Sequence, residues 1–184
     1  ATARGLTRFV GREMELAALD AALAQTRVGH GQVVAVVGAA GVGKSRLVDE
    51  FVAAAHAQGL LVLDSAAESY GQATPYFPVL DLLRRYCHLE EREDARTIRA
   101  KVTEQVRRLD AALEDTLPAL LALLDALPVD SPFWQLEAPQ RRQRTLLALK
   151  RVLLRESQAQ PVLLVCEDLH WLDTETQALL ESLI

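Results

Sequence analysis

Residues 38–45 read Gly38-Ala39-Ala40-Gly41-Val42-Gly43-Lys44-Ser45, a glycine-rich stretch of the form G-x-x-x-x-G-K-[ST]. An apolar run precedes it and predicts a buried strand over residues 32–37. The residues that follow have apolar side chains at helical spacing up to about Gln58, where Gly59 is typical of a helix end. A strand, a glycine turn and a helix in this order direct several backbone N–H groups to one point, and the helix dipole favours an anion there. The stretch therefore predicts a phosphate-binding loop.

The residue types in this loop predict a nucleoside triphosphate with magnesium as the ligand. Its three glycines would let the backbone approach the phosphates, because side chains at these positions would block that approach. We expect Lys44 to reach the β- and γ-phosphates and the Ser45 hydroxyl to hold Mg²⁺. A glycine turn without a ligand is the alternative, and the two correct flanks count against it. The predicted nucleotide-binding residues of this stretch are Gly38, Ala39, Ala40, Gly41, Val42, Gly43, Lys44, Ser45 and the adjoining Arg46.

A second candidate site follows the apolar run 161–166, which predicts another strand and ends in the adjacent carboxylates Glu167 and Asp168. Ligands of open α/β sheets bind at the carboxyl ends of the strands, and Mg²⁺ prefers few carboxylates together with waters and phosphate oxygens. We assign Glu167 to the magnesium and Asp168 to the attacking water, with the reverse assignment left open. Asp168 is short, so its role as a base predicts a bridging water and slow hydrolysis. The alternative is that both acids only end the strand in a solvated turn. The predicted catalytic residues are Lys44, Glu167 and Asp168.

The composition is that of a globular protein and excludes several classes of function. The 184 residues are 50% hydrophobic and carry 20 Lys and Arg against 25 Asp and Glu, a net charge of −5. This balance argues against direct nucleic-acid binding by the segment. No apolar run approaches a membrane span, and no signal-peptide core is present. The two cysteines have neither disulfide nor metal spacing, which favours a reducing, cytoplasmic location.

The organisation of the chain predicts a single α/β domain with a helical insertion. We expect a linker over 1–8, a phosphate-loop half over 9–65, a mainly helical insertion over 66–160, and an acidic strand with a following helix over 161–184. Apolar periodicity and capping residues predict the individual elements. Helices are expected at 11–25, 79–89, 94–109, 113–127 with Pro118 as a break or first-turn residue, 139–157 and from about Thr174, and a further strand at 60–64.

Three segments together resemble the signalling ATPases of the AAA+/STAND group. They are Phe-Val-Gly-Arg-Glu at 9–13, the phosphate loop, and Glu-Asp-Leu-His-Trp-Leu-Asp at 167–173. The nearest likeness is to the ATPase module linked to class III adenylate/guanylate cyclases, with related modules in large LuxR-type regulators. Segments 69–76 and 139–145 resemble that cyclase-linked subset. The likeness covers essentially the whole chain.

This resemblance implies a P-loop NTPase fold, a three-layer α/β/α arrangement with a parallel sheet. It makes the loop a Walker A motif and the acids a Walker B motif, and it places Val10 and Arg12 against the adenine. Because the family has two further strands after the acidic one, we interpret the chain as the N-terminal part of one such domain in a larger protein. The partners implied are ATP or ADP, neighbouring domains of the same polypeptide and a homo-oligomer on activation, without a membrane.

The leading hypothesis is an ATP- and Mg²⁺-binding module that switches state on binding or slow hydrolysis, a probable ATPase in the full-length protein. A nucleotide-binding scaffold without turnover is the alternative, and a phosphotransferase is weaker because no second substrate motif is visible. Other residues have a packing interpretation beside a functional one. We expect Asp173 and Thr174 to cap a helix, with Thr174 and Gln177 forming a capping box. His170 could sense the γ-phosphate or relay to a partner subunit, but packing of His170 and Trp171 over the strand end is favoured. Two other groups have a weaker functional interpretation: Arg141, Arg142 and Arg144 as an arginine finger, and Tyr70, Gln72 and Tyr76 as reporters of nucleotide state.

Overall fold

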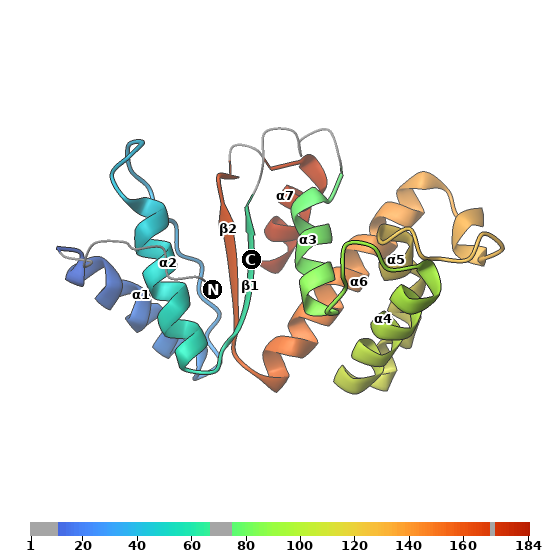
Figure 1. The fold of residues 1–184 in the computed structure, drawn as a ribbon, viewed down its shortest axis with the longest axis horizontal. Coiled ribbons are helices and arrows are strands. Elements are labelled where there is room, and N and C mark those ends of the chain that lie inside the picture. Colours follow the sequence, from blue (N-terminus) through green and yellow to red (C-terminus); the bar gives the residue numbers. More distant parts are fainter. Residues whose placement is uncertain (1–10, 67–74, 170–171) are drawn as a thin grey trace. The chain divides into compact units, whose positions relative to one another are not determined.

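The structure is a computed structural model that describes residues 11–66, 75–169 and 172–184 (Figure 1). The chain divides into two compact units, a first unit Ala1–Leu60 and a second unit Leu61–Ile184. Each unit is described below by itself. Among the described helices, none combines the length and the apolar character needed to cross a bilayer.

The first unit contains two helices, α1 (Glu13–Thr26) and α2 (Lys44–Ala57), which confirm the helices predicted on both sides of the apolar run. The end of α2 follows from its sequence. Gly59 has a left-handed φ of 77°, and its N–H donates to the His56 carbonyl at 2.9 Å. The N–H of Leu60 donates to the Ala55 carbonyl at 3.1 Å. These two bonds form a Schellman motif, so the assignment of Gly59 to the helix end is confirmed.

The predicted strand at 32–37 is wrong for this structure. Residues 31–39 form neither helix nor strand, and Val33, Val34 and Val37 are 72%, 51% and 89% exposed. A strand exists only when a second strand satisfies its backbone N–H and C=O groups. Within the described part of the first unit, 11–60, no second extended segment pairs with this run. Apolar character alone therefore does not produce a strand here.

The second unit contains a parallel pair of strands, β1 (Leu61–Ala66) and β2 (Val162–Glu167). The register runs from Leu61 opposite Val162 to Ala66 opposite Glu167, so both strands end at the same edge. This pair confirms the predicted strands at 60–64 and 161–166 and the parallel arrangement. Parallel neighbours need a crossover connection, and the helical segment between them supplies it. Among the described residues this sheet has two strands, a smaller sheet than the three-layer expectation implies.

The helices of the second unit agree with the predicted elements, with one informative difference. The stretch 113–127 is divided between a 3₁₀ helix and an α-helix, with Pro118 in the first turn of the latter. Proline lacks an N–H donor and fits the first helical turn, so α5 begins there. The elements are α3 (Phe77–Tyr86), α4 (Ala95–Leu109), η2 (Ala111–Thr116), α5 (Leu117–Leu123), η3 (Pro132–Gln135), α6 (Ala138–Ala159) and α7 (Thr174–Leu183).

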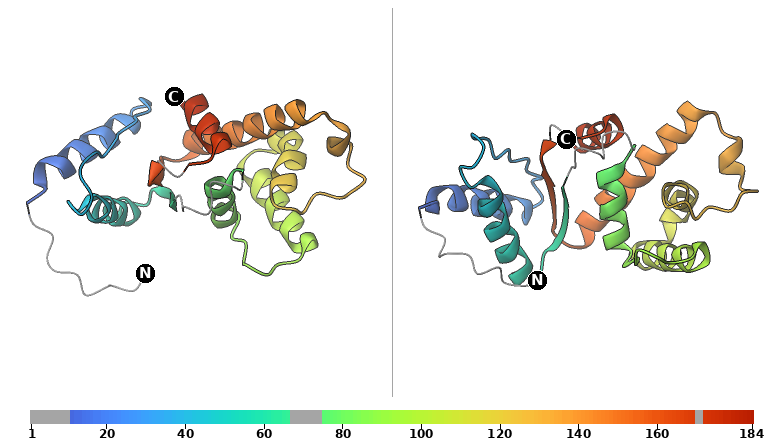
Figure 2. Two further views of the ribbon diagram at one scale, coloured as in Figure 1. Left: turned by 90° about the horizontal axis from the view of Figure 1, so that it is seen from above. Right: turned by 45° about the horizontal axis from the view of Figure 1, so that its top comes forward.

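The core of the second unit lies between one face of the sheet and the helices. Figures 1 and 2 show α3, α6 and α7 near the strands and α4 and α5 farther away. Leu63 and Leu164 face a small apolar cavity together with side chains of α3, α6 and α7. Beyond α6, the side chains of Val102 and Leu120 are 0% and 1% exposed. The leucine-rich stretch is therefore core of the helical segment, as its packing interpretation predicts.

Burial makes the thiol of Cys87 a poor nucleophile. The residue is 3% exposed, and burial raises the pKa of the thiol from 9.0 to about 12. In a Cys166→Ser variant, we expect Ellman's reagent to modify Cys87 at pH 8 only as fast as the protein unfolds, because the thiolate is the reactive form. The thiol loses its proton at a lower pH in the unfolded state than in the folded state. Its contribution to the free energy of unfolding is therefore complete below pH 9 and is lost as the pH rises toward 12. Rapid modification of the native protein, at the rate measured in guanidinium, would contradict this prediction.

Candidate functional site

The glycine-rich loop leads directly into a helix N-terminus. Gly41 and Gly43 have φ values of 77° and 86°, a region that side chains disfavour. Gly43 is the residue immediately before α2, a helix of 14 residues. The N–H groups of the first turn have no acceptor within the helix, and the helix dipole places partial positive charge there. The loop and α2 together therefore have the backbone features of an anion-binding site.

The Lys44 ammonium lies over the carbonyl side of this loop. Its Nζ donates to the carbonyl oxygens of Gly38 and Ala39, both at 3.0 Å. These acceptors are neutral, whereas phosphate oxygens are charged and form shorter and stronger hydrogen bonds with an ammonium. Ser45 is exposed one residue further along. The lysine can therefore exchange the two carbonyls for phosphate oxygens without leaving the loop.

The loop has little room for an added side chain at its first glycine. A Cβ at Gly38 would lie 3.1 Å from Cγ2 of Val42, which is closer than most real contacts. A side chain at this position would therefore have to displace the Val42 side chain by a few tenths of an ångström. Positive-φ glycines, a helix N-terminus and a lysine over the loop together fit a nucleotide phosphate chain.

Arg12 joins the loop from the N-terminal side. Its Nη2 donates to the Val42 carbonyl, and its Nη1 donates to Glu15 at 3.2 Å. The arginine of the 9–13 segment therefore contacts the phosphate loop, although the two lie far apart in the sequence. Arg46, in contrast, forms an ion pair with Glu50 of its own helix at 2.6 Å. Val10 lies outside the described residues.

Substitution of Gly43 tests the loop conformation. We expect Gly43→Ala to lower the free energy of unfolding by about 1–2 kcal/mol, because an L-residue with a left-handed φ costs about that much. The measurement is urea unfolding followed by circular dichroism. Gly31→Ala is the matched control, since a Cβ there meets nothing within 4 Å and Gly31 has no positive φ. An equal loss in both variants would contradict the assigned conformation.

The two acids lie where the second strand ends. Glu167 is the last residue of β2 and is half-buried, and Asp168 follows with a left-handed φ of 53° and an exposed side chain. No described residue donates a hydrogen bond to either carboxylate, which leaves their oxygens available to a metal ion or a water. Within the described ranges, no three His, Cys, Asp or Glu side chains gather in a metal-binding group. A carboxylate pair completed by phosphate oxygens and waters remains the magnesium site that these residues can offer.

The loop and the acids belong to different units. The loop lies in the first unit, and the acids follow β2 of the second unit. The structure brings Arg12 to the loop within the first unit and places Glu167 and Asp168 side by side within the second.

A buried aspartate is the residue whose role the sequence interpretation understated. Asp173 is 5% exposed, and its Oδ1 accepts from the N–H groups of Glu175 and Thr176, both at 3.0 Å. It is the N-cap of α7, as expected, but the predicted capping box of Thr174 and Gln177 is wrong. Thr174 is already helical, and Gln177 donates instead to Glu181 at 2.8 Å. Aspartate is a stronger N-cap than threonine, so the helix begins one residue earlier.

Asp173 also binds a residue far away in the sequence. Its Oδ1 accepts from the N–H of Tyr76 at 2.9 Å, across 97 residues. Tyr76 is 7% exposed, and its hydroxyl donates to Glu175 at 3.1 Å. Burial raises the pKa of Tyr76, and the hydrogen bond to Glu175 acts in the same direction, so the hydroxyl stays protonated. No local sequence pattern indicates this contact.

The arginines of α6 have partners within the chain. Arg141 donates to the Leu136 carbonyl at 2.6 Å, and Arg142 Nε donates to both carboxylate oxygens of Glu175 at 2.8 and 2.7 Å. These contacts favour a structural role for both residues over an arginine finger. Arg144 is exposed on the same helix. The other residues singled out from the sequence, Tyr70, Gln72, His170 and Trp171, lie outside the described residues.

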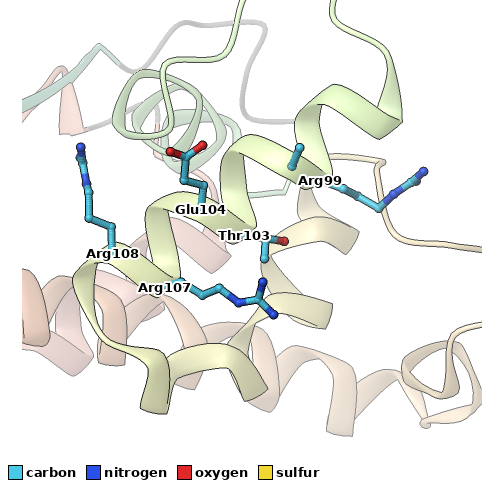
Figure 3. A pocket seen from close by; sticks show the side chains of 6 residues that line it. Arg99, Thr103, Glu104, Arg107 and Arg108 are labelled. Atoms are coloured by element: carbon cyan, nitrogen blue, oxygen red, sulfur yellow. The ribbon is translucent and has the colours of Figure 1, made fainter.

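A shallow depression on α4 is a helix surface without the features of a site. Figure 3 shows its side chains projecting from one helix in different directions. Arg107 donates to Glu114 at 2.8 Å, and Arg99 donates to the Ala126 carbonyl at 2.9 Å. The arginine charges are thus engaged by the chain itself. We assign no ligand to this surface.

Comparison with known families agrees with the geometry of the loop. The family described as AAA ATPase domain matches residues 8–184. Comparisons with curated proteins and with solved structures give no match. The match begins just before the Arg12 segment and includes both the loop and the acidic pair, and the family implies a P-loop α/β fold and ATP binding. The chain therefore belongs to the AAA ATPase domain family.

Proposed function

We propose that the chain is an ATP- and Mg²⁺-binding regulatory module of a multidomain signalling protein. The observation that carries this proposal is the loop at 38–45, with its left-handed glycines, its lysine over the loop and its position before α2. Membership of the AAA ATPase domain family supports ATP as the nucleotide. The likeness of segments 9–13 and 167–173 to STAND-type and cyclase-linked modules supports the signalling role.

Each residue has a defined task in this proposal. The loop N–H groups and Lys44 bind the phosphates, and Arg12 holds the loop backbone through the Val42 carbonyl. Ser45 and Glu167 are the magnesium ligands, and Asp168 orients the attacking water as a base. Magnesium, when bound, neutralises charge that develops on the phosphate oxygens. Asp168 has a short side chain and would act through a bridging water, which fits slow turnover.

The signal would come from a difference in nucleotide affinity between two states of the module. A ligand shifts an equilibrium only by its differential affinity for the two states. ATP contacts both motifs in the proposed active state, whereas ADP lacks the γ-phosphate that Lys44 and the acids would share. Neighbouring domains would then respond to the change in the second unit, and a homo-oligomer could form in the active state.

Calorimetric titration of the full chain tests the proposal. We expect ATP and ADP to bind, Mg²⁺ to strengthen ATP binding, and adenosine without phosphates to bind far more weakly, because the loop recognises phosphate. Equal affinity for adenosine and ATP would contradict it. Measurement of phosphate release then distinguishes a hydrolysing switch from a scaffold without turnover. ATP binding without phosphate release by the full-length protein favours the scaffold. Phosphate transfer to another nucleotide would support the phosphotransferase instead.

A further inference from the structure

We propose that Asp173, Tyr76, Glu175 and Arg142 form a positioning cluster that fixes the acidic motif relative to the helical segment. This inference rests on the proposed function, because it assigns these residues a part in placing Glu167 and Asp168. None of the four is a catalytic residue, since they act through the backbone that carries the acids. We call them the Asp173 cluster.

The centre of the cluster is the buried carboxylate. Asp173 accepts four hydrogen bonds from described residues: the N–H groups of Tyr76, Glu175 and Thr176 to Oδ1, and the Thr176 hydroxyl to Oδ2 at 2.6 Å. A helix cap needs only one or two of these bonds. The bond to Tyr76 adds nothing to the cap and instead ties a distant segment to the start of α7.

Further contacts extend the cluster to a third element. The Tyr76 hydroxyl donates to Glu175, and Glu175 binds Arg142 of α6 through both carboxylate oxygens. Glu175 is the more buried of this ion pair, with 22% of its side chain exposed against 48% for Arg142. The segment before α3, the start of α7 and the long helix α6 are thereby linked.

The cluster connects the two chain segments that follow the carboxyl ends of β1 and β2, where a ligand is expected. β1 and β2 end at the same edge, where Ala66 lies opposite Glu167. The chain that leaves β1 is tied down at Tyr76, and the chain that leaves β2 is tied down at Asp173. The Asp173–Tyr76 bond therefore joins the two segments that depart from the carboxyl edge of the sheet. Ligands of parallel sheets bind at this edge.

Two of the four described non-glycine residues with a left-handed φ lie in these segments, the other two being His88 and Asp125. Asp168 and Tyr76 have left-handed φ values of 53° and 62°. Such values are uncommon for residues with a side chain, and for a bulky residue such as tyrosine they persist only when the surroundings enforce them. One of the two is the proposed base, and the other is the residue held by Asp173.

The test uses the full chain and variants that keep the helix cap. Asp173→Ser retains an N-cap residue but is too short to reach the Tyr76 N–H as well, and Arg142→Gln removes the ion pair from an exposed position. Arg151→Gln is the matched control, because Arg151 lies on the same helix and forms a comparable pair with Asp115 at 2.6 Å. Two quantities are measured for each: ATP affinity with and without Mg²⁺, and hydrogen exchange of the Leu172 amide, which donates to the Leu169 carbonyl at 3.2 Å in the acidic segment.

The expected result is a selective loss at the acids. In Asp173→Ser, ATP affinity without Mg²⁺ should stay within about twofold of the wild-type value. The factor by which Mg²⁺ increases ATP affinity should fall about fivefold or more, which corresponds to the loss of one net hydrogen bond. The Leu172 amide should exchange at least about tenfold faster. Arg142→Gln should show smaller changes in the same direction. Arg151→Gln should change neither the effect of Mg²⁺ on ATP affinity nor the exchange rate.

Two results would overturn the inference. One is an unchanged Mg²⁺ gain and unchanged exchange at the Leu172 amide in a folded Asp173→Ser variant. The other is an equal change in Arg151→Gln. Failure of the wild-type chain to bind ATP would instead overturn the proposed function, and the exchange measurement would still decide whether the cluster positions the acids.

Discussion

Replacement of Lys44 by alanine is expected to weaken ATP binding by about a hundredfold or more. The ammonium now bonds two neutral carbonyls, and in the proposed complex it bonds charged phosphate oxygens. A hydrogen bond to a charged group contributes about 1.5–3 kcal/mol, and two such bonds to the β- and γ-phosphates account for this loss. Calorimetric titration with ATP and Mg²⁺ measures it. Binding of ADP should suffer less, because the contact with the γ-phosphate is absent from both proteins.

Lys101→Ala is the control for this prediction. Lys101 lies on α4 in the second unit and pairs with Glu93 while donating to the His88 carbonyl at 2.8 Å. Its loss removes the same charge from the chain without touching the phosphate loop, so ATP affinity should stay within about twofold. ATP binding by Lys44→Ala within threefold of wild type would contradict the assignment of this loop as the phosphate site.

Local patterns predicted most of the helices because the signals that start and end a helix lie within a few residues. Asp94 precedes α4 and accepts from the Thr97 N–H at 2.7 Å, and Gly59 ends α2 with two Schellman bonds. Pro118 fixes the start of α5 within its stretch. In each case the physical cause and its effect are neighbours in the sequence, so periodicity and capping residues were sufficient.

Apart from the local capping box of Thr174 and Gln177, the errors concern features that need a partner far away in the sequence. The run at 32–37 has the composition of a strand, but pairing depends on a second segment that composition does not specify. The contact between Tyr76 and Asp173 spans 97 residues and uses a backbone N–H, a group that every residue except proline carries. The sequence could show that Asp173 caps a helix. It could not show that the same oxygen also holds Tyr76.

The same distinction between local and distant features applies to the candidate site. The loop residues and the acids could be proposed from the sequence because each motif is contiguous, and the structure places Lys44 over the loop and Glu167 at a strand end. The resemblance implied that Arg12 lies against the adenine, and it did not indicate the contact of Arg12 with the Val42 carbonyl that is found within the first unit. The motifs do not indicate which contacts position Glu167 and Asp168, and we propose the Asp173 cluster for this role.

Leu120→Ala should cost about 2–5 kcal/mol of stability and leave the nucleotide site intact. Leu120 is 1% exposed in the core of the second unit, and truncating a buried leucine removes burial and leaves a cavity. Urea unfolding measures the loss. Leu147→Ala is the control, because Leu147 of α6 is 53% exposed and surface changes cost about 0.5 kcal/mol or less. ATP affinity of folded Leu120→Ala should match the wild type, since the residue is remote in sequence and unit from the loop. Weaker ATP binding by Leu120→Ala with an unchanged free energy of unfolding would contradict the assignment of Leu120 to the core. The expected result, lower stability with unchanged ATP affinity, distinguishes this variant from Lys44→Ala, which should lose ATP affinity.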